Sequence, residues 1–201
     1  MKLKQAQKIA AELVQQLAPH CERIQIAGSI RREKPEVKDI EIVAIPKPYE
    51  VGLFESGIAT VVNRWVKVKG ELPCKYTQRV IPIDLGFDFA QPDSRVSMSG
   101  TGVTLSGTGV TLSEVEGIKL DLFFATPANW GLILAIRTGS AEYSHKVLAA
   151  GWVRKGYHSV DGMLFHEKSK WERKVKDEWE LFQLLGIAMP EPKDREVNEK
   201  S

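Results

Sequence analysis

The pattern of apolar and polar positions predicts a helix at the start of the chain and several strands after it. Ile9, Leu13 and Leu17 recur at helical spacing, which indicates an amphipathic helix over Lys4–Leu17. The segment 118–125 has strand-like alternation, with Leu120, Leu122 and Phe124 on one side. The remaining strands are predicted at 23–27, 39–45, 75–83, around 159 and at 163–166, and the remaining helices at 53–65, 130–137, 141–155 and 177–185. This mixture predicts the α+β fold class.

A repeat interrupts the pattern. Residues 99–105 read Ser-Gly-Thr-Gly-Val-Thr-Leu, and residues 106–112 repeat them without change. The surrounding stretch, about 85–117, is rich in Gly, Ser and Thr and lacks the periodicity of a core element. A surface hairpin loop tolerates such an insertion, because the cost of loop closure rises slowly with length. We expect the repeats either to pair as a short hairpin extension or to be disordered.

The composition is that of a soluble globular protein, with 43% hydrophobic and 27% charged residues. No apolar run approaches the ~18–20 residues that a membrane span needs, and no apolar stretch follows the first charged residues as in a secretory signal. Cys21 and Cys74 lack metal-type spacing, which indicates thiols in a reducing compartment. We therefore expect a cytoplasmic monomer without a membrane partner.

Two acidic residues on one predicted strand give the first indication of chemistry. Asp39 and Glu41 lie two positions apart and therefore project from the same face, while Ile40 points into the core. Adjacent carboxylates on an apolar strand repel each other and lose solvation, and a divalent cation between them relieves both costs. An isolated Asp-x-Glu is more often an exposed strand face, so the residues around it decide the interpretation.

A Gly-Ser turn lies ten residues before Asp39. Gly28 and Ser29 can offer backbone N–H groups and a hydroxyl to phosphate oxygens at close range. Arg31 and Arg32 follow the turn and can add charge-assisted hydrogen bonds to a triphosphate. The turn, the arginines and the carboxylates together favour a phosphate-handling metal site over an exposed strand face.

These residues resemble the nucleotidyltransferase signature in the version of the family X DNA polymerases, the polymerase beta group. Further motifs extend the resemblance over most of the chain outside the repeat. They are Lys69-Gly70-Glu71 with Lys75, Ile118–Leu122, Thr138–Ala141, Trp179–Phe182, Leu185-Gly186 and Glu191–Arg195. The resemblance implies a reduced polymerase. Its nucleotidyltransferase palm, a mixed sheet flanked by helices, would span 1–128 with the repeat insert at about 85–117, and a small α/β C-terminal subdomain contacting the nucleotide and base pair would span 129–201.

Two aspartates compete for the role of third carboxylate. Asp121 and Asp84 each lie between apolar residues, Asp121 within a predicted strand and Asp84 at the end of one. Asp121 lies 17 residues before Thr138, which is the interval that the resemblance requires, whereas Asp84 abuts the repeat, where its strand is expected to end. Lys119 shares a face with Asp121 and adds a cation there. We choose Asp121 and keep Asp84 as the alternative.

The resemblance implies template-directed DNA synthesis, in which a primer 3′-hydroxyl attacks the α-phosphorus of a dNTP and pyrophosphate leaves, as in short-gap filling during DNA repair. Asp39, Glu41 and Asp121 would be catalytic and would hold two Mg²⁺ ions, with Mn²⁺ as the alternative. The implied nucleotide-binding residues are Gly28, Ser29, Arg31, Arg32, Arg137, Thr138, Gly139 and Ser140. The implied contacts to gapped or primer–template DNA are Lys69, Lys75, Arg79, Lys119, Tyr143 and His145.

Two groups of basic residues bear on DNA binding. The first group is opposed only by Glu71 and comprises Arg64, Lys67, Lys69, Lys75 and Arg79. The second lies within Lys168–Lys176. Either group can hold a nucleic-acid backbone through salt-sensitive contacts, or can be an ordinary solvated face.

Several positions depart from the polymerase pattern. Glu41 stands where these polymerases carry Asp, and Ile136-Arg137 stands where an aromatic pair disfavours ribonucleotides, so sugar selectivity is expected to be relaxed. The helix that carries Tyr143 and His145 is one residue longer than the pattern. The alternative for these two side chains is a core tyrosine and a surface histidine.

Two other functions compete with templated DNA synthesis. One is nucleotidyl transfer to a different acceptor, such as an RNA end, a protein or a small molecule. The other is a non-catalytic DNA-binding remnant inactivated by the repeat. The Thr-Gly-Ser turn and the Glu-Pro-Lys-Asp-Arg ending favour the polymerase, and the complete set of three carboxylates favours catalysis.

Overall fold

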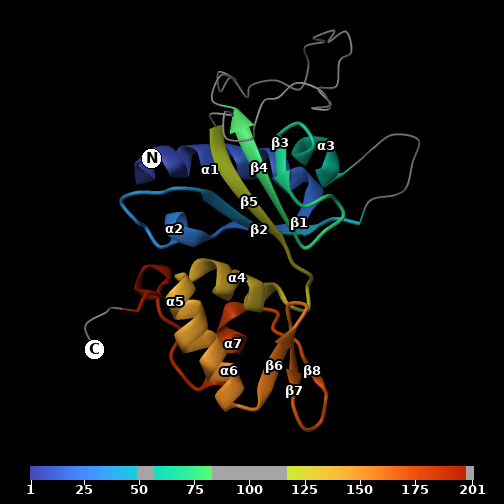
Figure 1. The fold of residues 1–201 in the computed structure, drawn as a ribbon, viewed down its shortest axis with the longest axis vertical. Coiled ribbons are helices and arrows are strands. Elements are labelled where there is room, and N and C mark those ends of the chain that lie inside the picture. Colours follow the sequence, from blue (N-terminus) through green and yellow to red (C-terminus); the bar gives the residue numbers. More distant parts are fainter. Residues whose placement is uncertain (49–56, 83–116, 198–201) are drawn as a thin grey trace.

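The computed structural model describes residues 1–48, 57–82 and 117–197, and it confirms the α+β class. A five-stranded mixed sheet flanked by helices is followed by a small three-stranded sheet among further helices (Figure 1). The first part contains α1 (Leu3–Leu17), η1 (Ala18–His20), β1 (Cys21–Ile26), α2 (Gly28–Arg31), β2 (Ile40–Pro46), α3 (Ile58–Val62), β3 (Val66–Lys69), β4 (Tyr76–Pro82) and β5 (Gly117–Phe124). The second contains α4 (Trp130–Thr138), α5 (Ala141–Tyr143), η3 (Ser144–Ala149), α6 (Ala150–Arg154), β6 (Tyr157–Val160), β7 (Met163–His166), β8 (Glu172–Arg173), α7 (Glu178–Leu185) and η4 (Pro192–Asp194).

The large sheet has the strand order β1-β2-β5-β4-β3. β2 pairs with β5 in parallel, whereas the other neighbouring pairs are antiparallel. The strand that follows Asp39 and the strand that contains Asp121 are therefore neighbours at the centre of the sheet, although they lie far apart in the sequence.

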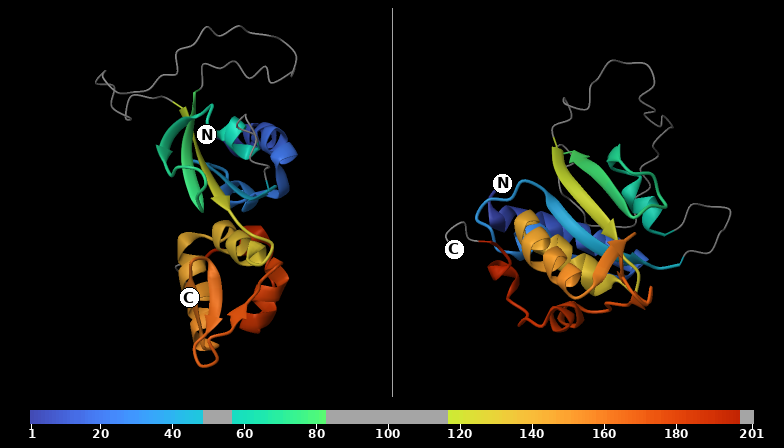
Figure 2. Two further views of the ribbon diagram at one scale, coloured as in Figure 1. Left: turned by 90° about the vertical axis from the view of Figure 1, so that its right-hand side faces the viewer. Right: turned by 60° about the horizontal axis from the view of Figure 1, so that its bottom comes forward.

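The two faces of this sheet pack against different helices. The face toward α1 is apolar and forms one core, to which the strands contribute Ile40, Ile42, Ala44, Ile81, Ile118, Leu120 and Leu122. On the other face, Val43 and Phe123 form a core with Trp130 and Leu134 of α4. Figure 2 shows α1 beside the sheet, and α4 between the sheet and the remaining C-terminal elements. Because side chains alternate along a strand, Glu41 and Asp121 belong to the α4 face.

Most of the predicted elements are confirmed within the described residues, with boundaries shifted by one or two positions. The helix predicted at 53–65 is described only as α3, because 53–56 lie outside the described residues. The predicted end at 65 was wrong, since the helix ends at Val62. Asp84, the end of the predicted strand at 75–83 and all but the last residue of the insert also lie outside them. β3 and β8 were not predicted, because both are short and rich in charged residues that weaken an apolar pattern.

The predicted helix at 141–155 is continuous over α5, η3 and α6, and η3 has π-helical hydrogen bonding. A π turn accommodates one extra residue within a helix.

Among the described residues, no helix combines the length and apolarity that crossing a membrane would require.

Candidate active site

The three predicted carboxylates come together on the α4 face of the sheet. Glu41 on β2 is the direct partner of Asp121 on β5 in the parallel register, and Asp39 immediately precedes β2. All three side chains are half-buried. The grouping of Asp39, Glu41 and Asp121 predicted from the sequence is therefore present in the fold.

Burial and mutual repulsion raise the pKa values of two of these acids. Burial, followed by the negative charges of Asp39 and Asp121, raises the pKa of Glu41 to about 7, and this is only partly opposed by Arg32 and Arg137. Burial and then the charge of Asp121 raise the pKa of Asp39, against the nearby Lys119 and Lys38. A site that makes its own carboxylates hard to ionise is one that a cation would stabilise.

The Gly-Ser turn lies directly against this cluster. Gly28 has a φ of 61°, which favours glycine, and a Cβ atom there would lie 1.8 Å from Oε2 of Glu41. The Ala27 amide donates to the Glu41 carbonyl at 2.8 Å, which fixes the turn to β2. Within the described residues, the buried Oγ of Ser29 has no hydrogen-bond partner. A buried hydroxyl without a partner is costly, and a bound phosphate oxygen would satisfy it.

Tyr76 and Gln78 on β4 hold Asp121, and sequence reasoning missed both residues. The Tyr76 hydroxyl and the Gln78 amide each donate to Oδ1 of Asp121 at 2.8 Å. Burial and the contact with Asp121 raise the pKa of Tyr76 to about 12, so the phenol remains a donor. The Tyr76 ring stacks on Phe123 with centroids 4.9 Å apart, which fixes its position. Only the cross-strand register reveals these contacts.

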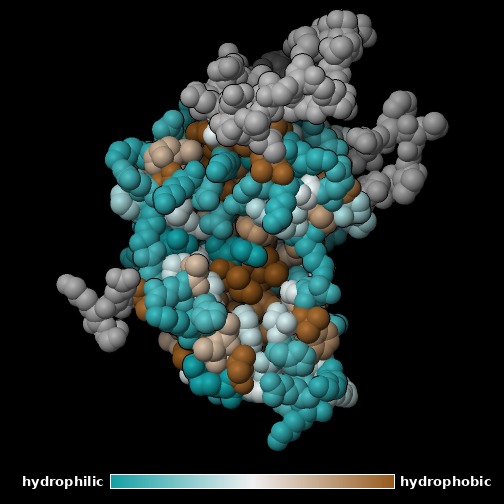
Figure 3. Space-filling view, in the orientation of Figure 1, coloured by the Kyte–Doolittle hydropathy of each residue, from teal (hydrophilic) through white to brown (hydrophobic). Residues whose placement is uncertain are grey.

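Arg137 extends from α4 toward the same cluster. Its guanidinium lies 4.0 Å from the centroid of the Phe123 ring, and its charge lowers the pKa of Glu41. The side chain is exposed, and the neighbouring Ile133 and Ile136 are half-buried. Figure 3 shows an apolar area over α4 bordered by hydrophilic side chains. The site therefore combines acidic groups, a cation and an apolar floor.

The Thr-Gly-Ser turn joins α4 to α5. Thr138 is fully buried, and Ser140 caps the following helix by accepting from the Tyr143 amide at 3.1 Å. A Cβ atom on Gly139 would lie 2.8 Å from Cδ1 of Tyr143 and 2.9 Å from Oγ of Ser144. These contacts give Thr138, Gly139 and Ser140 a structural role, and their predicted nucleotide contact remains a prediction.

Arg31 and Arg32 contact the C-terminal part of the chain. Arg31 makes a bidentate ion pair with Glu178 at 2.9 and 2.7 Å, and it donates to the Thr138 hydroxyl at 2.5 Å. Arg32 donates to the Thr138 carbonyl at 2.7 Å and to Glu196 at 3.0 Å. Sequence reasoning did not identify these acidic partners. Arg32 nevertheless lies close enough to Glu41 to lower its pKa.

The predicted DNA contacts divide into exposed and buried side chains. Lys69, Lys75, Lys119 and His145 are exposed, and Lys75 forms an ion pair with Asp161 at 2.9 Å. The prediction that Arg79 is a DNA contact in the first basic group was wrong. Only 1% of Arg79 is exposed, and its Nη1 donates to the Gly70 carbonyl at 3.2 Å.

Tyr143 is also buried, with 6% of its surface exposed, and it belongs to the core beneath α4 and α7. The alternative interpretation of Tyr143 as a core tyrosine is therefore the one that the structure supports. Burial raises the pKa of its hydroxyl, against the charge of Arg195. His145 fits the surface alternative, because its side chain is exposed.

The three carboxylates suit a hard divalent cation such as Mg²⁺, because they offer only oxygen atoms as ligands. A buried hydroxyl, that of Ser29, lies beside them without a partner among the described residues. In the described part of the chain, no three acidic, His or Cys side chains are already gathered around one point as a metal site. Asp121 is instead held toward β4 by Tyr76 and Gln78, and Glu41 lies against Gly28.

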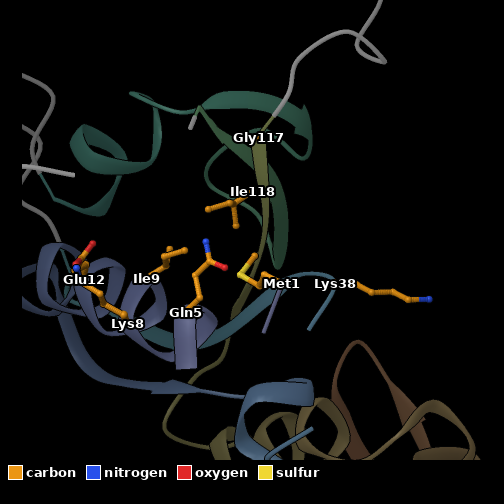
Figure 4. A pocket seen from close by; sticks show the side chains of 8 residues that line it. All are labelled: Met1, Gln5, Lys8, Ile9, Glu12, Lys38, Gly117 and Ile118. Atoms are coloured by element: carbon orange, nitrogen blue, oxygen red, sulfur yellow. The ribbon is translucent and has the colours of Figure 1, made fainter. Parts of the chain in front are cut away.

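A separate pocket lies on the opposite face of the sheet, between α1 and the start of β5 (Figure 4). Its lining residues are Met1, Gln5, Lys8, Ile9, Glu12, Lys38, Gly117 and Ile118. It includes none of the three carboxylates, so it is not part of the site described above.

No protein-family model matches this chain, and a search of curated proteins found no match. The function is therefore inferred from the residues and their geometry.

The raised pKa of Glu41 predicts how stability depends on pH in the absence of metal. Between pH 4.5 and about 7 the folded protein keeps the Glu41 proton and the unfolded chain does not, so stability falls as pH rises across this window. With about 1.4 kcal/mol per pKa unit, and less for a half-buried group, we expect a loss of roughly 2 kcal/mol in unfolding free energy.

Urea unfolding in EDTA at several pH values measures this loss. Glu41→Gln should remove most of the slope in this window, and Mg²⁺ should reduce it in the parent protein, because metal binding requires the ionised carboxylate. Identical pH profiles for the parent and Glu41→Gln would contradict the prediction.

Proposed function

We propose that this protein is a metal-dependent nucleotidyltransferase with a family X polymerase palm, which adds a dNMP from a dNTP to a primer 3′-hydroxyl and fills short gaps during DNA repair. The observation that carries the proposal is the parallel pairing of Glu41 with Asp121, beside Asp39 and against the Gly28-Ser29 turn. The five-stranded mixed sheet flanked by helices is compatible with such a palm.

Asp39, Glu41 and Asp121 would hold two Mg²⁺ ions, with Mn²⁺ as the alternative. When bound, the ions would supply positive charge to the phosphate oxygens and make the primer hydroxyl more acidic. The chain itself supplies the positioning of the ligands. Tyr76 and Gln78 fix one oxygen of Asp121, and the parallel register fixes the spacing between Glu41 and Asp121.

The triphosphate would lie along the Gly28-Ser29 turn. The buried Ser29 hydroxyl would donate to a phosphate oxygen, and Arg32 and Arg137 would neutralise negative charge at the positions from which they already act on Glu41. Arg31 would act indirectly, because Glu178 engages both terminal nitrogens of its guanidinium, whereas Arg32 uses only Nε and Nη1 toward described residues. Such fixed charges act mainly by positioning and by electrostatic stabilisation.

The acceptor proposed is DNA. Lys69, Lys119 and His145 are exposed and can meet its phosphate backbone, and Lys119 is also near enough to Asp39 to lower its pKa. Arg137 stands where one residue of the expected aromatic pair would lie, and it extends toward the carboxylates. No aromatic side chain at this position would then exclude the 2′-hydroxyl of a ribonucleotide. We therefore propose that discrimination against ribonucleotides is weak.

Primer extension on DNA with a one-nucleotide gap tests the function, with each dNTP supplied singly and Mg²⁺ present. We expect one nucleotide to be added, and the complementary dNTP to be preferred. Addition that ignores the templating base would refute templated synthesis and would leave transfer to another acceptor. No addition with any dNTP or NTP, in Mg²⁺ or Mn²⁺, would contradict the nucleotidyltransferase proposal itself.

A further inference from the structure

An exposed tryptophan lies on the turn between β7 and β8. We call residues 167–174 the Trp171 hairpin; all eight of its side chains are exposed. Trp171 is 78% exposed, the most of any large hydrophobic side chain in the described residues. Removing a tryptophan from water is strongly favourable, so a side chain left this open needs an explanation.

The charge around Trp171 is mainly positive. Lys168, Lys170, Arg173 and Lys174 outnumber the two acids of the hairpin, Glu167 and Glu172. None of these six charged side chains forms an ion pair with another described residue. The hairpin therefore presents a large aromatic ring among cations that are available to a negatively charged partner.

The backbone holds this ring on an ordered turn. The His166 amide donates to the Trp171 carbonyl at 3.0 Å, and the Lys170 amide donates to the His166 carbonyl at 2.8 Å. Lys170 has a φ of 58°, a left-handed conformation that is costly for lysine and that the two hydrogen bonds maintain. A ring on such a turn loses little conformational freedom when it contacts a partner.

We propose that the Trp171 hairpin binds single-stranded nucleic acid, with the indole stacked on an unpaired base and the neighbouring cations on the phosphates. Stacking on an aromatic ring accepts any base, and lysine and arginine add a sequence-independent attraction to the backbone. An unpaired strand fits better than a duplex, because bases inside a duplex are already stacked on one another.

The choice of nucleic acid rests on the proposed function, which places DNA on the same molecule. Charge complementarity also favours it over an uncharged partner. A membrane surface fits less well, because Trp171 is the only large apolar side chain of the hairpin, whereas membrane binding needs a broader apolar face. Figure 1 shows the β7–β8 turn at the lower end of the molecule, away from the five-stranded sheet. The strand bound there would thus be a single-stranded stretch outside the paired region at the carboxylates.

The chain provides a matched control in Trp179. This residue is also exposed, at 54%, but its neighbours in the sequence are the acids Asp177, Glu178 and Glu180. Asp177 is ion-paired with Arg23, and Glu178 with Arg31 and Arg195, so Trp179 has no unpaired cation directly beside it in the sequence to hold a phosphate. Its removal should therefore not affect nucleic-acid binding. Both rings are exposed enough for substitution to leave the fold intact, which the melting temperature would verify.

Fluorescence anisotropy with a labelled single-stranded DNA of about 16 nucleotides tests the proposal, using the full chain without metal or dNTP. Trp171→Ala should weaken binding about tenfold, which corresponds to the loss of one base–aromatic contact. Trp171→Phe should restore most of the affinity, and Trp179→Ala should bind like the parent. Lys170→Gln with Arg173→Gln should flatten the dependence of affinity on salt. Affinity for a fully paired duplex should change less than twofold with Trp171→Ala.

Equal binding of single strands by the parent and Trp171→Ala would overturn the inference, as would an absence of binding by the parent. If Trp171→Ala lost binding to anionic phospholipid vesicles but bound single strands like the parent, the partner would be a membrane instead. The assay involves no catalysis, so it is distinct from a test of the proposed function. If the protein extends primers but its Trp171→Ala variant binds single strands normally, only this inference is refuted. If the protein binds single strands through Trp171 but transfers no nucleotide, only the proposed function is refuted.

Discussion

Asp121→Asn is expected to lower nucleotide addition on gapped DNA by about a thousandfold, which is the upper range for losing one preorganised electrostatic group. The substitution keeps the shape of the side chain and an oxygen that can accept from Tyr76 and Gln78, so the β4–β5 contact should persist. What is lost is the negative charge opposite Glu41 in the parallel register. The defect should therefore appear in catalysis and metal binding, and not in folding.

The measurement is single-turnover primer extension, combined with Mn²⁺ titration followed by electron paramagnetic resonance. Asp121→Asn should weaken Mn²⁺ binding and leave the melting temperature within a few degrees of the parent. Asp194→Asn removes an exposed carboxylate elsewhere and should behave like the parent in both assays. Parental activity in a folded Asp121→Asn variant would remove Asp121 from the site and return Asp84 to consideration.

The second large effect concerns stability. Glu178→Ala is expected to cost about 3–5 kcal/mol of unfolding free energy, because it leaves two arginines without their carboxylate. Arg195 is only 1% exposed and Arg31 only 17%, and both donate to Glu178. Arg195 has one other acceptor among the described residues, the Pro190 carbonyl at 3.2 Å.

The acid dependence of this difference provides a further check. Burial alone would raise the pKa of Glu178, but the hydrogen bonds from Arg31 and Arg195 outweigh it and lower the pKa. A lowered folded-state pKa gives stability that is present above the unfolded value and lost as pH falls toward the folded one. The difference between the parent and Glu178→Ala should therefore shrink on acidification.

Glu191→Ala is the matched control for Glu178→Ala, since it removes an exposed acid from the same C-terminal segment. It should change the unfolding free energy by less than about 0.5 kcal/mol. A Glu178→Ala variant as stable as Glu191→Ala would show that the ion pairs make no net contribution.

Local patterns were sufficient for four of the five strands of the large sheet, and only β3 was not predicted. The alternation around Asp39–Glu41 and around Asp121 predicted two strands with the acids on one face, because side chains two positions apart on a strand share a face. The same rule, applied to β4, separates Arg79 from Tyr76 and Gln78 and places it on the face of the buried Thr77 and Ile81. The charge of Arg79 by itself predicts an exposed side chain, whereas its position on β4 predicts a buried one.

The amino-acid sequence by itself determined the α+β class, the boundaries of the main helices and strands, and the face on which each carboxylate projects, since these depend on residues close together in the chain. Only the tertiary structure decided that β2 and β5 pair in parallel with Glu41 beside Asp121, that Tyr76 and Gln78 hold Asp121, and that Glu178 and Glu196 engage the arginines of the Gly-Ser turn. Those contacts join residues separated by tens of positions or more. No periodicity records them, because strand register and helix docking are selected by the packing of the whole core.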